Sequence, residues 1–281
     1  MEYKTLIGGI GFRVQTDNPI ETETAYIPFF TEYLPEATVT VRYINDCPHI
    51  PTTLEKKCGE NLLLEYYRMQ SDMICLAKGG PDGPLAMTVW NPDFSKIECH
   101  VTAEYPQTLG NLLRLIPMHM ILQHYGITFF HASQIALGDK GVLFTAPSGT
   151  GKTTQAHLWE THCSAKILCN DRTLVRAGRT YSYPLDGSEP VALNETKTLA
   201  AIIVLGQAKE NQIVRLRPGA AVSALMPQLI IDAWSSEVRE TAISQLLTLI
   251  RKIPVYRFLC KPDFTAVECL KQTLMKEGVI P

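Results

Sequence analysis

The sequence predicts an α/β protein in which a β-rich part, residues 1–104, precedes a mixed α/β domain, residues 105–281. Three observations support this prediction. Short apolar or alternating segments, separated by Gly, Pro, Asp and Asn, fill the first part. A helical spacing of apolar residues begins near residue 107. Beyond it, apolar runs alternate with helical segments, and one run leads into the glycine-containing turn "APSGTGKT" at 146–153.

The first 104 residues contain several segments with the character of strands. "TLIGGIGFRV" predicts a short hairpin, and "ATVTVRYI" at 37–44 alternates with period two, as a half-buried strand does. Four further segments of the same kind are "NLLLEYYR", "DMICLAKG", "LAMTVW" and "KIECHV". We expect an antiparallel sheet. It carries no chemical motif, so recognition of an acceptor substrate and a structural or oligomerising role both stay open.

Residues 107–125 switch to helical spacing, and Pro117 predicts a kink or an early break. The apolar face consists of Leu109, Leu112, Leu113, Ile116 and Met120. Strands "SQIAL" (133–137) and "GVLFT" (141–145) then flank the turn "GDKG", and a helix is expected from Lys152. Further strands are "AKILC" (165–169) and "LAAIIVL" (199–205).

The C-terminal part predicts two helices, each with one apolar face. The first face consists of Val238, Ala242, Leu246, Leu249 and Ile250, and the second of Phe264, Val267, Leu270 and Leu274.

Composition limits the class of function. The 281 residues are 46% hydrophobic and 19% charged with a formal net charge of −2, which is ordinary for a globular chain and gives no indication of a nucleic-acid or anionic-membrane partner. The most apolar helical stretch, 109–126, is interrupted by Arg114, Pro117 and His119 and is too polar to span a bilayer. The N-terminus has no signal-peptide pattern. We expect a soluble cytoplasmic protein with no nucleic-acid or membrane partner.

The eight cysteines are scattered, form no C-x-x-C pair and have no zinc-finger spacing with histidines. Buried reduced thiols are therefore favoured over a metal or redox site. His157 and His162 do not have the i, i+4 spacing that two zinc ligands on one helix face require.

The turn at 146–153 predicts a phosphate-binding loop. Gly149 and Gly151 permit a backbone that turns its N–H groups inward around an anion, and the following helix adds its N-terminal dipole. Lys152 would reach the outer phosphates and the Thr153 hydroxyl would bind Mg²⁺. Ala146 stands where the usual pattern has its first glycine. The weaker alternative is a Gly-rich turn with an incidental lysine. The predicted nucleotide-binding residues are Pro147, Ser148, Gly149, Thr150, Gly151, Lys152, Thr153 and Thr154.

Such a loop needs a carboxylate at the end of a neighbouring strand to hold the metal. "AKILCNDRTLV" at 165–175 offers Asp171 after a strand, so Thr153 and Asp171 are the predicted Mg²⁺ ligands. The alternative is that Asn170 and Asp171 only form a turn, as these residue types often do.

Together, "FHASQIAL-GDKG-VLFTAPSGTGKTTQ" and "ILCNDRTLV" resemble the HPr kinase/phosphorylase family and, more distantly, phosphoenolpyruvate carboxykinase. The resemblance covers about residues 125 to 210. It implies a mixed-sheet P-loop core of the phosphoenolpyruvate carboxykinase/HPr kinase type, ATP and Mg²⁺ as cofactors, and transfer of phosphate to a hydroxyl. It places His131 near the transferring phosphoryl group and makes Asp171 the metal-binding member of an acidic pair. Relatives form rings, so a homo-oligomer is a further expectation.

One residue departs from the family pattern. Asn170 stands where the family has the proposed base for the acceptor hydroxyl, and an amide cannot take up a proton at neutral pH. Because phosphoryl transfer depends mainly on positioning and charge stabilisation, His131 or Asp171 could serve instead. Asp186 and Glu189 are further carboxylates, for which a solvated loop is the favoured interpretation.

Three functions are therefore compared. The first is an ATP-dependent kinase with His131, Lys152 and Asp171 as catalytic residues and a serine-like hydroxyl in a peptide, protein or metabolite as acceptor. Relatives of the family occur beside peptide-modification genes, which implies that a ribosomal peptide is one candidate. The second is a nucleotide-binding regulatory or adaptor protein that no longer transfers phosphate, as Asn170 suggests. Carboxykinase chemistry ranks last, because the chain is short for that enzyme and has no recognisable oxaloacetate-binding residues.

Overall fold

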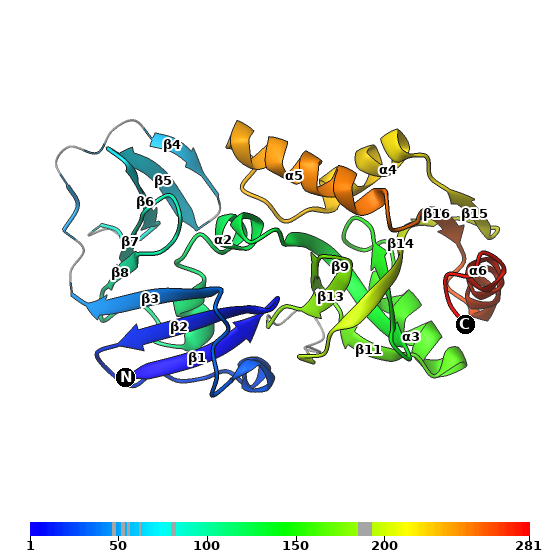
Figure 1. The fold of residues 1–281 in the computed structure, drawn as a ribbon, viewed down its shortest axis with the longest axis horizontal. Helices are drawn as coiled ribbons and strands as arrows, with labels where there is room; N and C mark the ends of the chain where they lie inside the picture. The colour runs from blue at the N-terminus through cyan, green and yellow to red at the C-terminus, as the bar shows by residue number, and fades with distance from the viewer. Residues whose placement is uncertain (47–48, 52–53, 55–56, 62, 80–82, 185–192) are drawn as a thin grey trace. The chain divides into compact units, whose positions relative to one another are not determined.

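The computed structural model describes residues 1–46, 49–51, 54, 57–61, 63–79, 83–184 and 193–281. Their contacts divide the chain into two compact units (Figure 1). Unit 1 consists of Met1–Tyr125 and Asp232–Arg239, and unit 2 of Gly126–Ile231 and Glu240–Pro281. The first division therefore falls after Tyr125 and not after residue 104, and a short C-terminal segment returns to unit 1.

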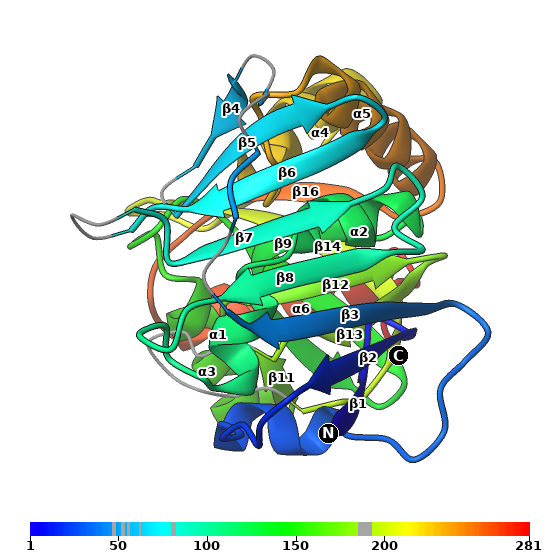
Figure 2. The same cartoon turned by 90° about the vertical axis from the view of Figure 1, so that its left-hand side faces the viewer.

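Unit 1 is built on one eight-stranded sheet in the order β1-β2-β3-β8-β7-β6-β5-β4 (Figure 2). The β1–β2 hairpin is confirmed: Ile7 pairs with Ile10 around two glycines that both have positive φ. The expectation of a purely antiparallel sheet is wrong, because β3 pairs in parallel with both β2 and β8. The strands are β1 (Glu2–Ile7), β2 (Ile10–Thr16), β3 (Thr38–Asn45), β4 (Lys57–Glu60), β5 (Leu64–Met69), β6 (Asp72–Ala77), β7 (Ala86–Trp90) and β8 (Ile97–Val101).

The helical stretch predicted near 107–125 is two short helices, α1 (Leu109–Leu113) and α2 (Met118–His124), and Pro117 is the residue that caps the second. Both belong to unit 1. The buried Tyr43 hydroxyl donates to the Leu112 carbonyl at 2.7 Å, and the Thr88 hydroxyl donates to the Leu115 carbonyl at 2.9 Å. These bonds attach the helical stretch to the strands before it, which is why unit 1 extends past residue 104. A 3₁₀ helix, η1 (Thr24–Phe29), completes this part.

The returning segment Asp232–Arg239 is held inside unit 1. Asp232 is buried, with its carboxylate 3.4 Å from both the Tyr66 hydroxyl and the His119 Nδ1. The Trp234 ring packs on the Tyr66 ring with centroids 4.9 Å apart. The Gln123 amide donates to the Val238 carbonyl at 2.9 Å.

Unit 2 contains the elements that follow, and the predicted strand and helix sequence around the glycine turn is confirmed. Its strands are β9 (Thr128–Leu137), β10 (Lys140–Thr145), β11 (Lys166–Cys169), β12 (Arg172–Arg176), β13 (Arg179–Ser182), β14 (Lys197–Gln207), β15 (Gln212–Arg215) and β16 (Val255–Cys260). Its helices are α3 (Lys152–Cys163), α4 (Pro218–Leu225), η2 (Met226–Gln228), α5 (Ser236–Ile250), whose first turn is grouped with unit 1, and α6 (Phe264–Lys276).

The sheet of unit 2 is also mixed. β9 pairs antiparallel with β10 on one edge and with β11 and β12 on the other. β10, β14 and β16 are parallel neighbours, with Thr145 opposite Val204 and Gln207 opposite Cys260. The carboxyl ends of these three strands therefore lie along one edge of the sheet, where open α/β sheets usually bind ligands. β14 is a nearly continuous apolar run, as a strand covered on both faces is expected to be.

Two buried clusters cover the two faces of this sheet. One joins Val142, Phe144 and Ile203 to residues of α3 and α6, and the other joins Phe130 and Ile202 to residues of α4 and α5. The apolar faces predicted for the two C-terminal helices are confirmed except at Phe264, which is 45% exposed and stacks on His162. Phe264 is the first residue of α6, directly after the N-cap Asp263.

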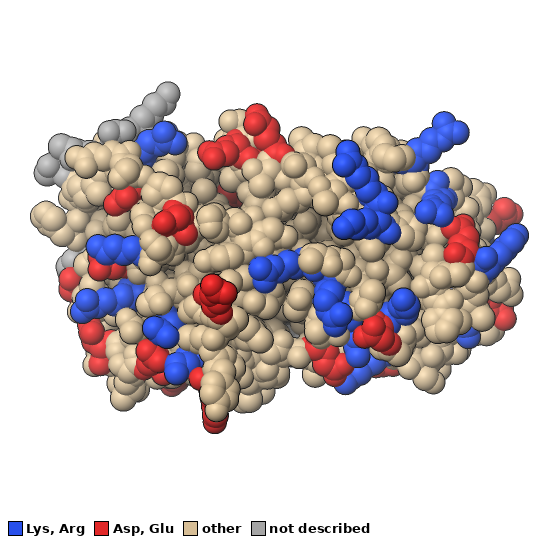
Figure 3. Space-filling model, in the orientation of Figure 1, with Lys and Arg blue, Asp and Glu red and all other residues tan. Residues whose placement is uncertain are grey.

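Acidic and basic side chains are interspersed on the face of the molecule drawn in Figure 3. Among the described residues, no helix combines the length and the apolar character that a bilayer crossing needs.

Candidate functional site

The candidate site is centred on Ala146–Thr153, here named the glycine loop, which joins β10 to α3. Gly149 has φ 77° and Gly151 has φ 108°. Residues other than glycine rarely adopt this backbone conformation. Ala146, the first residue of the loop, is fully buried, and Lys152 is the first residue of α3. The predicted order of apolar strand, glycine turn and helix is therefore confirmed.

Lys152 lies inside this loop and not on its surface. Its side chain is 7% exposed and its Nζ donates to the carbonyls of Ala146 at 3.0 Å and Pro147 at 3.4 Å. Burial lowers the pKa of Lys152, and the nearby negative charge of Asp171 partly opposes that shift. The ammonium is thus held by loop carbonyls in a position from which it can exchange them for oxygens of an anion.

The other predicted loop residues surround this lysine. Pro147 and Ser148 are exposed, Thr150 and Thr153 are half-buried, and Thr154 is exposed on the first turn of α3. Backbone N–H groups at the start of this helix have no intrahelical acceptor, so the loop can present several of them to one anion.

Asp171 lies in a bend between β11 and β12. Both strands pair with β9, and the Asp171 carbonyl accepts from the Ala132 N–H at 3.0 Å. In the β12–β9 register Arg172 stands opposite His131. This places Nε2 of His131 3.2 Å from Oδ1 of Asp171, and Nε of Arg172 3.3 Å from Oδ2. The structure therefore brings the predicted His131 and Asp171 together.

The Asp171 carboxyl is held in its ionised form. Its hydrogen bond with His131 lowers its pKa most, and the charges of His131 and Arg172 lower it further, whereas partial burial acts in the opposite direction. An ionised carboxylate that is one-third exposed is a suitable oxygen ligand for Mg²⁺. Among the described residues, no group of three or more His, Cys, Asp and Glu side chains that could hold a metal ion is found.

Asn170 has a different environment from Asp171. It is 6% exposed, and its carbonyl accepts from the Ser133 hydroxyl at 2.9 Å. The residue that replaces the acid of the expected pair is therefore a buried part of the β11 end, and the carboxylate beside His131 is Asp171. The two other carboxylates considered, Asp186 and Glu189, lie outside the described residues.

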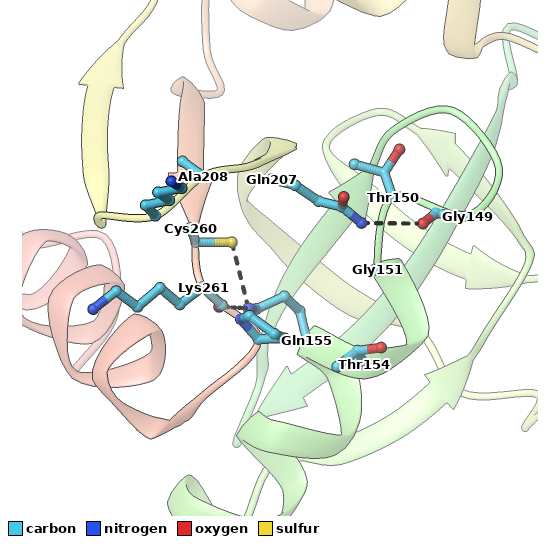
Figure 4. A pocket seen from close by; sticks show the side chains of 11 residues that line it. Gly149, Thr150, Gly151, Thr154, Gln155, Gln207, Ala208, Cys260 and Lys261 are labelled. Atoms are coloured by element: carbon cyan, nitrogen blue, oxygen red, sulfur yellow. Dashed lines mark hydrogen bonds between the residues drawn. The ribbon is translucent and has the colours of Figure 1, made fainter.

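A pocket of about 510 Å³ opens beside the glycine loop (Figure 4). Its walls come from the loop and the start of α3, from the end of β14 with the residues after it, and from the end of β16 with the residues after it. The Gln207 side chain donates to the Gly149 carbonyl at 3.3 Å and so connects two of these walls. The lining residues are Gly149, Thr150, Gly151, Thr154, Gln155, Gln207, Ala208, Lys209, Cys260, Lys261 and Pro262.

Three residues of the candidate site, Arg172, Gln207 and Lys261, are not among those predicted from the sequence. Arg172 follows Asp171 directly, so its position beside the carboxylate could have been inferred from "NDR". Gln207 and Lys261 carry no such signal. They reach the loop only because β14 and β16 pair in parallel with Gln207 opposite Cys260.

The described cysteines are all free, as expected, and four of them are buried. Burial raises the pKa of the Cys99 thiol to about 12 and of the Cys260 thiol to about 11. Cys58 differs from the prediction because it is exposed, on the edge strand β4.

No curated protein matches the chain. The model of the family described as "SynChlorMet cassette protein ScmC" matches residues 99–265, which is more than half of the chain. The match includes His131, the glycine loop, Asp171 and the residues that follow β14 and β16. The chain belongs to the ScmC family.

Proposed function

We propose that this protein binds Mg-ATP at the glycine loop and transfers the γ-phosphoryl group to a hydroxyl acceptor. The observation that carries the proposal is the position of Lys152, which is buried in the loop and donates to the carbonyls of Ala146 and Pro147. The strand residue Thr145, directly before the loop, pairs with Ala132, whose N–H donates to the Asp171 carbonyl at 3.0 Å. A cation for the outer phosphates and a carboxylate for the metal then lie at one place, which is the minimum that phosphoryl transfer on such a loop requires.

Each residue has a defined part in the proposed reaction. Lys152 would exchange the loop carbonyls for oxygens of the β- and γ-phosphates. Thr153 and Asp171 would hold Mg²⁺, which when bound neutralises charge that develops on the phosphates. The glycine-loop N–H groups and the α3 dipole would stabilise the same charge.

His131 supplies a nitrogen that can hold the proton of the acceptor hydroxyl. It is 31% exposed and its ring is oriented by Asp171. A loose transition state for phosphoryl transfer asks little of a base, so Asn170 does not by itself prevent the reaction. Arg172, on the other carboxylate oxygen, would keep Asp171 in place.

One similarity supports a kinase. The residues around the loop resemble those of the HPr kinase/phosphorylase family, so we propose that unit 2 is a P-loop core of that type. A serine-like hydroxyl in a peptide, protein or small molecule is the proposed acceptor.

A regulatory or adaptor protein that binds ATP without transferring phosphate is the alternative. The observation that favours it is Asn170, since an amide replaces the acid that relatives would use as the base.

The first test is a calorimetric titration of Mg-ATP into the purified protein and into Lys152→Ala. Lys271→Ala, which changes an exposed lysine on α6, is the matched control. We expect binding to the wild-type and control proteins and its loss in Lys152→Ala; equal binding to all three would contradict the proposal. ADP release that depends on an added acceptor then separates the kinase from the adaptor.

A further inference from the structure

We infer that the donor is a nucleoside triphosphate whose nucleoside half occupies the pocket beside Gln207 and Lys261, with its transferring phosphate at the opposite end of the loop. This inference rests on the proposed function, because it assumes that the glycine loop binds the phosphates. It distinguishes a nucleotide donor from an inorganic polyphosphate, which would need no such pocket.

The first argument is the order of strands around the loop. β10, which leads into the loop, has β9 on one edge and β14 on the other, and β14 is followed by β16. His131 and Asp171 lie on the β9 side, whereas Gln207 ends β14, and Ala208 and Lys261 follow β14 and β16. A chain of phosphates that crosses the loop therefore has its reacting end on one side and its remaining substituent on the other.

The second argument is the pocket itself. Its volume of about 510 Å³ lies within the range of small-molecule sites. It shares Gly149, Thr150 and Gly151 with the glycine loop (Figure 4), so a ligand held there would be continuous with phosphates bound by the loop. No Asp or Glu occurs among its described lining residues, whereas Lys209 and Lys261 do, so a polyanionic ligand meets no carboxylate on that side.

The third argument is the side chain of Gln155. It is 2% exposed, and its Nε2 donates to Sγ of Cys260 at 3.5 Å and to the Lys261 carbonyl at 3.4 Å. Because a carbonyl only accepts, the amide nitrogen has to face Lys261. Oε1 then has no hydrogen-bond partner among the described residues. A buried acceptor of this kind calls for a donor. The exocyclic amino group of adenine, the base of the proposed ATP, is such a donor.

The test compares Mg-ATP, Mg-ITP and Mg-tripolyphosphate by calorimetry with the full-length chain. ITP has a carbonyl oxygen where ATP has the amino group. We expect ATP to bind at least about tenfold more tightly than tripolyphosphate, with ITP losing most of that advantage. Ala208→Phe, which fills the pocket, should bind ATP no better than tripolyphosphate and keep the wild-type affinity for tripolyphosphate. Thr248→Phe, an exposed position on α5, is the control and should leave all three affinities unchanged.

Gln155→Met is the second variant, in case Ala208→Phe does not fold, and should reduce the ATP preference in the same way. If wild-type protein binds ATP and tripolyphosphate equally, or if the pocket variants keep the ATP preference, the nucleoside inference is wrong while the phosphate loop stands. If wild-type protein binds neither ligand, the proposed function fails and the inference fails with it.

Discussion

His131 and Asp171 face each other across the β9–β12 pairing, with Nε2 of the histidine 3.2 Å from Oδ1 of the carboxylate. Arg172 lies 3.3 Å from the other oxygen. One carboxylate is thus shared by a group that can hold a proton and by a permanent cation. The arrangement keeps the Asp171 carboxyl ionised and orients the neighbouring imidazole.

Replacing His131 by alanine should slow phosphoryl transfer much more than it weakens nucleotide binding. Loss of a positioned proton acceptor usually costs a factor of about 10² to 10⁴ in rate. We expect ADP release from Mg-ATP to fall by at least about 10²-fold, with the affinity for Mg-ATP changed only a few-fold. His157→Ala, on the exposed side of α3, is the control. Unchanged ADP release in His131→Ala would remove the histidine from the reaction.

Replacing Asp171 by asparagine should separate nucleotide binding from its dependence on the metal. The amide keeps the size of the side chain and loses the charge that Mg²⁺ requires. Binding of ATP in the presence of EDTA should match that of the wild-type protein, whereas added Mg²⁺ should no longer tighten it. The measurement is the ATP affinity with and without Mg²⁺ for both proteins. A normal tightening by Mg²⁺ in the variant would show that Asp171 is not the metal ligand.

The ionised Asp171 should also contribute stability that depends on pH. Its pKa is lower in the folded protein than its ordinary value, so the contribution is fully present above that ordinary value and is lost as the pH falls through the folded one. Because its neighbours are partly exposed, we expect no more than about 1 kcal/mol. The free energies of unfolding of wild-type protein and Asp171→Asn should therefore differ near pH 7 and converge as the pH falls below the folded-state pKa of Asp171. A difference that stays constant with pH would exclude this ion pair as its source.

The sequence predicts the phosphate side of the candidate site and not its pocket side. The order of strand, glycine turn, helix and second strand is local, so patterns within 130–176 are sufficient to place Lys152 and Asp171 near one another. Gln207 and Lys261 depend on parallel pairing between β14 and β16, which are separated along the chain by two α-helices, a 3₁₀ helix and a strand. Periodicity reports which face of a strand is buried and not which strand lies beside it.

Because periodicity does not report which elements lie side by side, two predictions about the fold are wrong: the antiparallel sheet of unit 1 and the boundary after residue 104. Alternation in "ATVTVRYI" identifies β3 as a strand, and the short spacing between strands favours antiparallel neighbours. In the structure β3 instead pairs in parallel with β2 and β8. The change to helical spacing near residue 107 marks a change of secondary structure and not of compact unit, because Tyr43 and Thr88 bind the helical stretch back to the sheet.

Replacing Gly149 by alanine should strain the loop without any collision. A Cβ built at this glycine has no neighbour within 4 Å, so the cost comes only from φ 77° and should be about 1 to 2 kcal/mol. Gly219→Ala is the matched control, since its Cβ also has no neighbour and the residue lies in α4 with no positive φ. That change should be neutral or stabilise by up to about 1 kcal/mol. Urea unfolding measures both, and equal effects would contradict the strained loop.

Gly59→Ala should destabilise unit 1 through one side chain, Trp234. An added Cβ would lie 2.1 Å from Cδ2 of the indole, which packs on Tyr66 and belongs to the segment that carries the buried Asp232. Because the ring cannot move without leaving Tyr66, we expect a loss of about 1 to 3 kcal/mol, typical of an overpacked core. The loss should be much smaller in a Trp234→Ala background, where the colliding ring is absent. A double-mutant cycle from urea unfolding tests this, and the same loss in both backgrounds would show that Gly59 is not required for the position of Trp234.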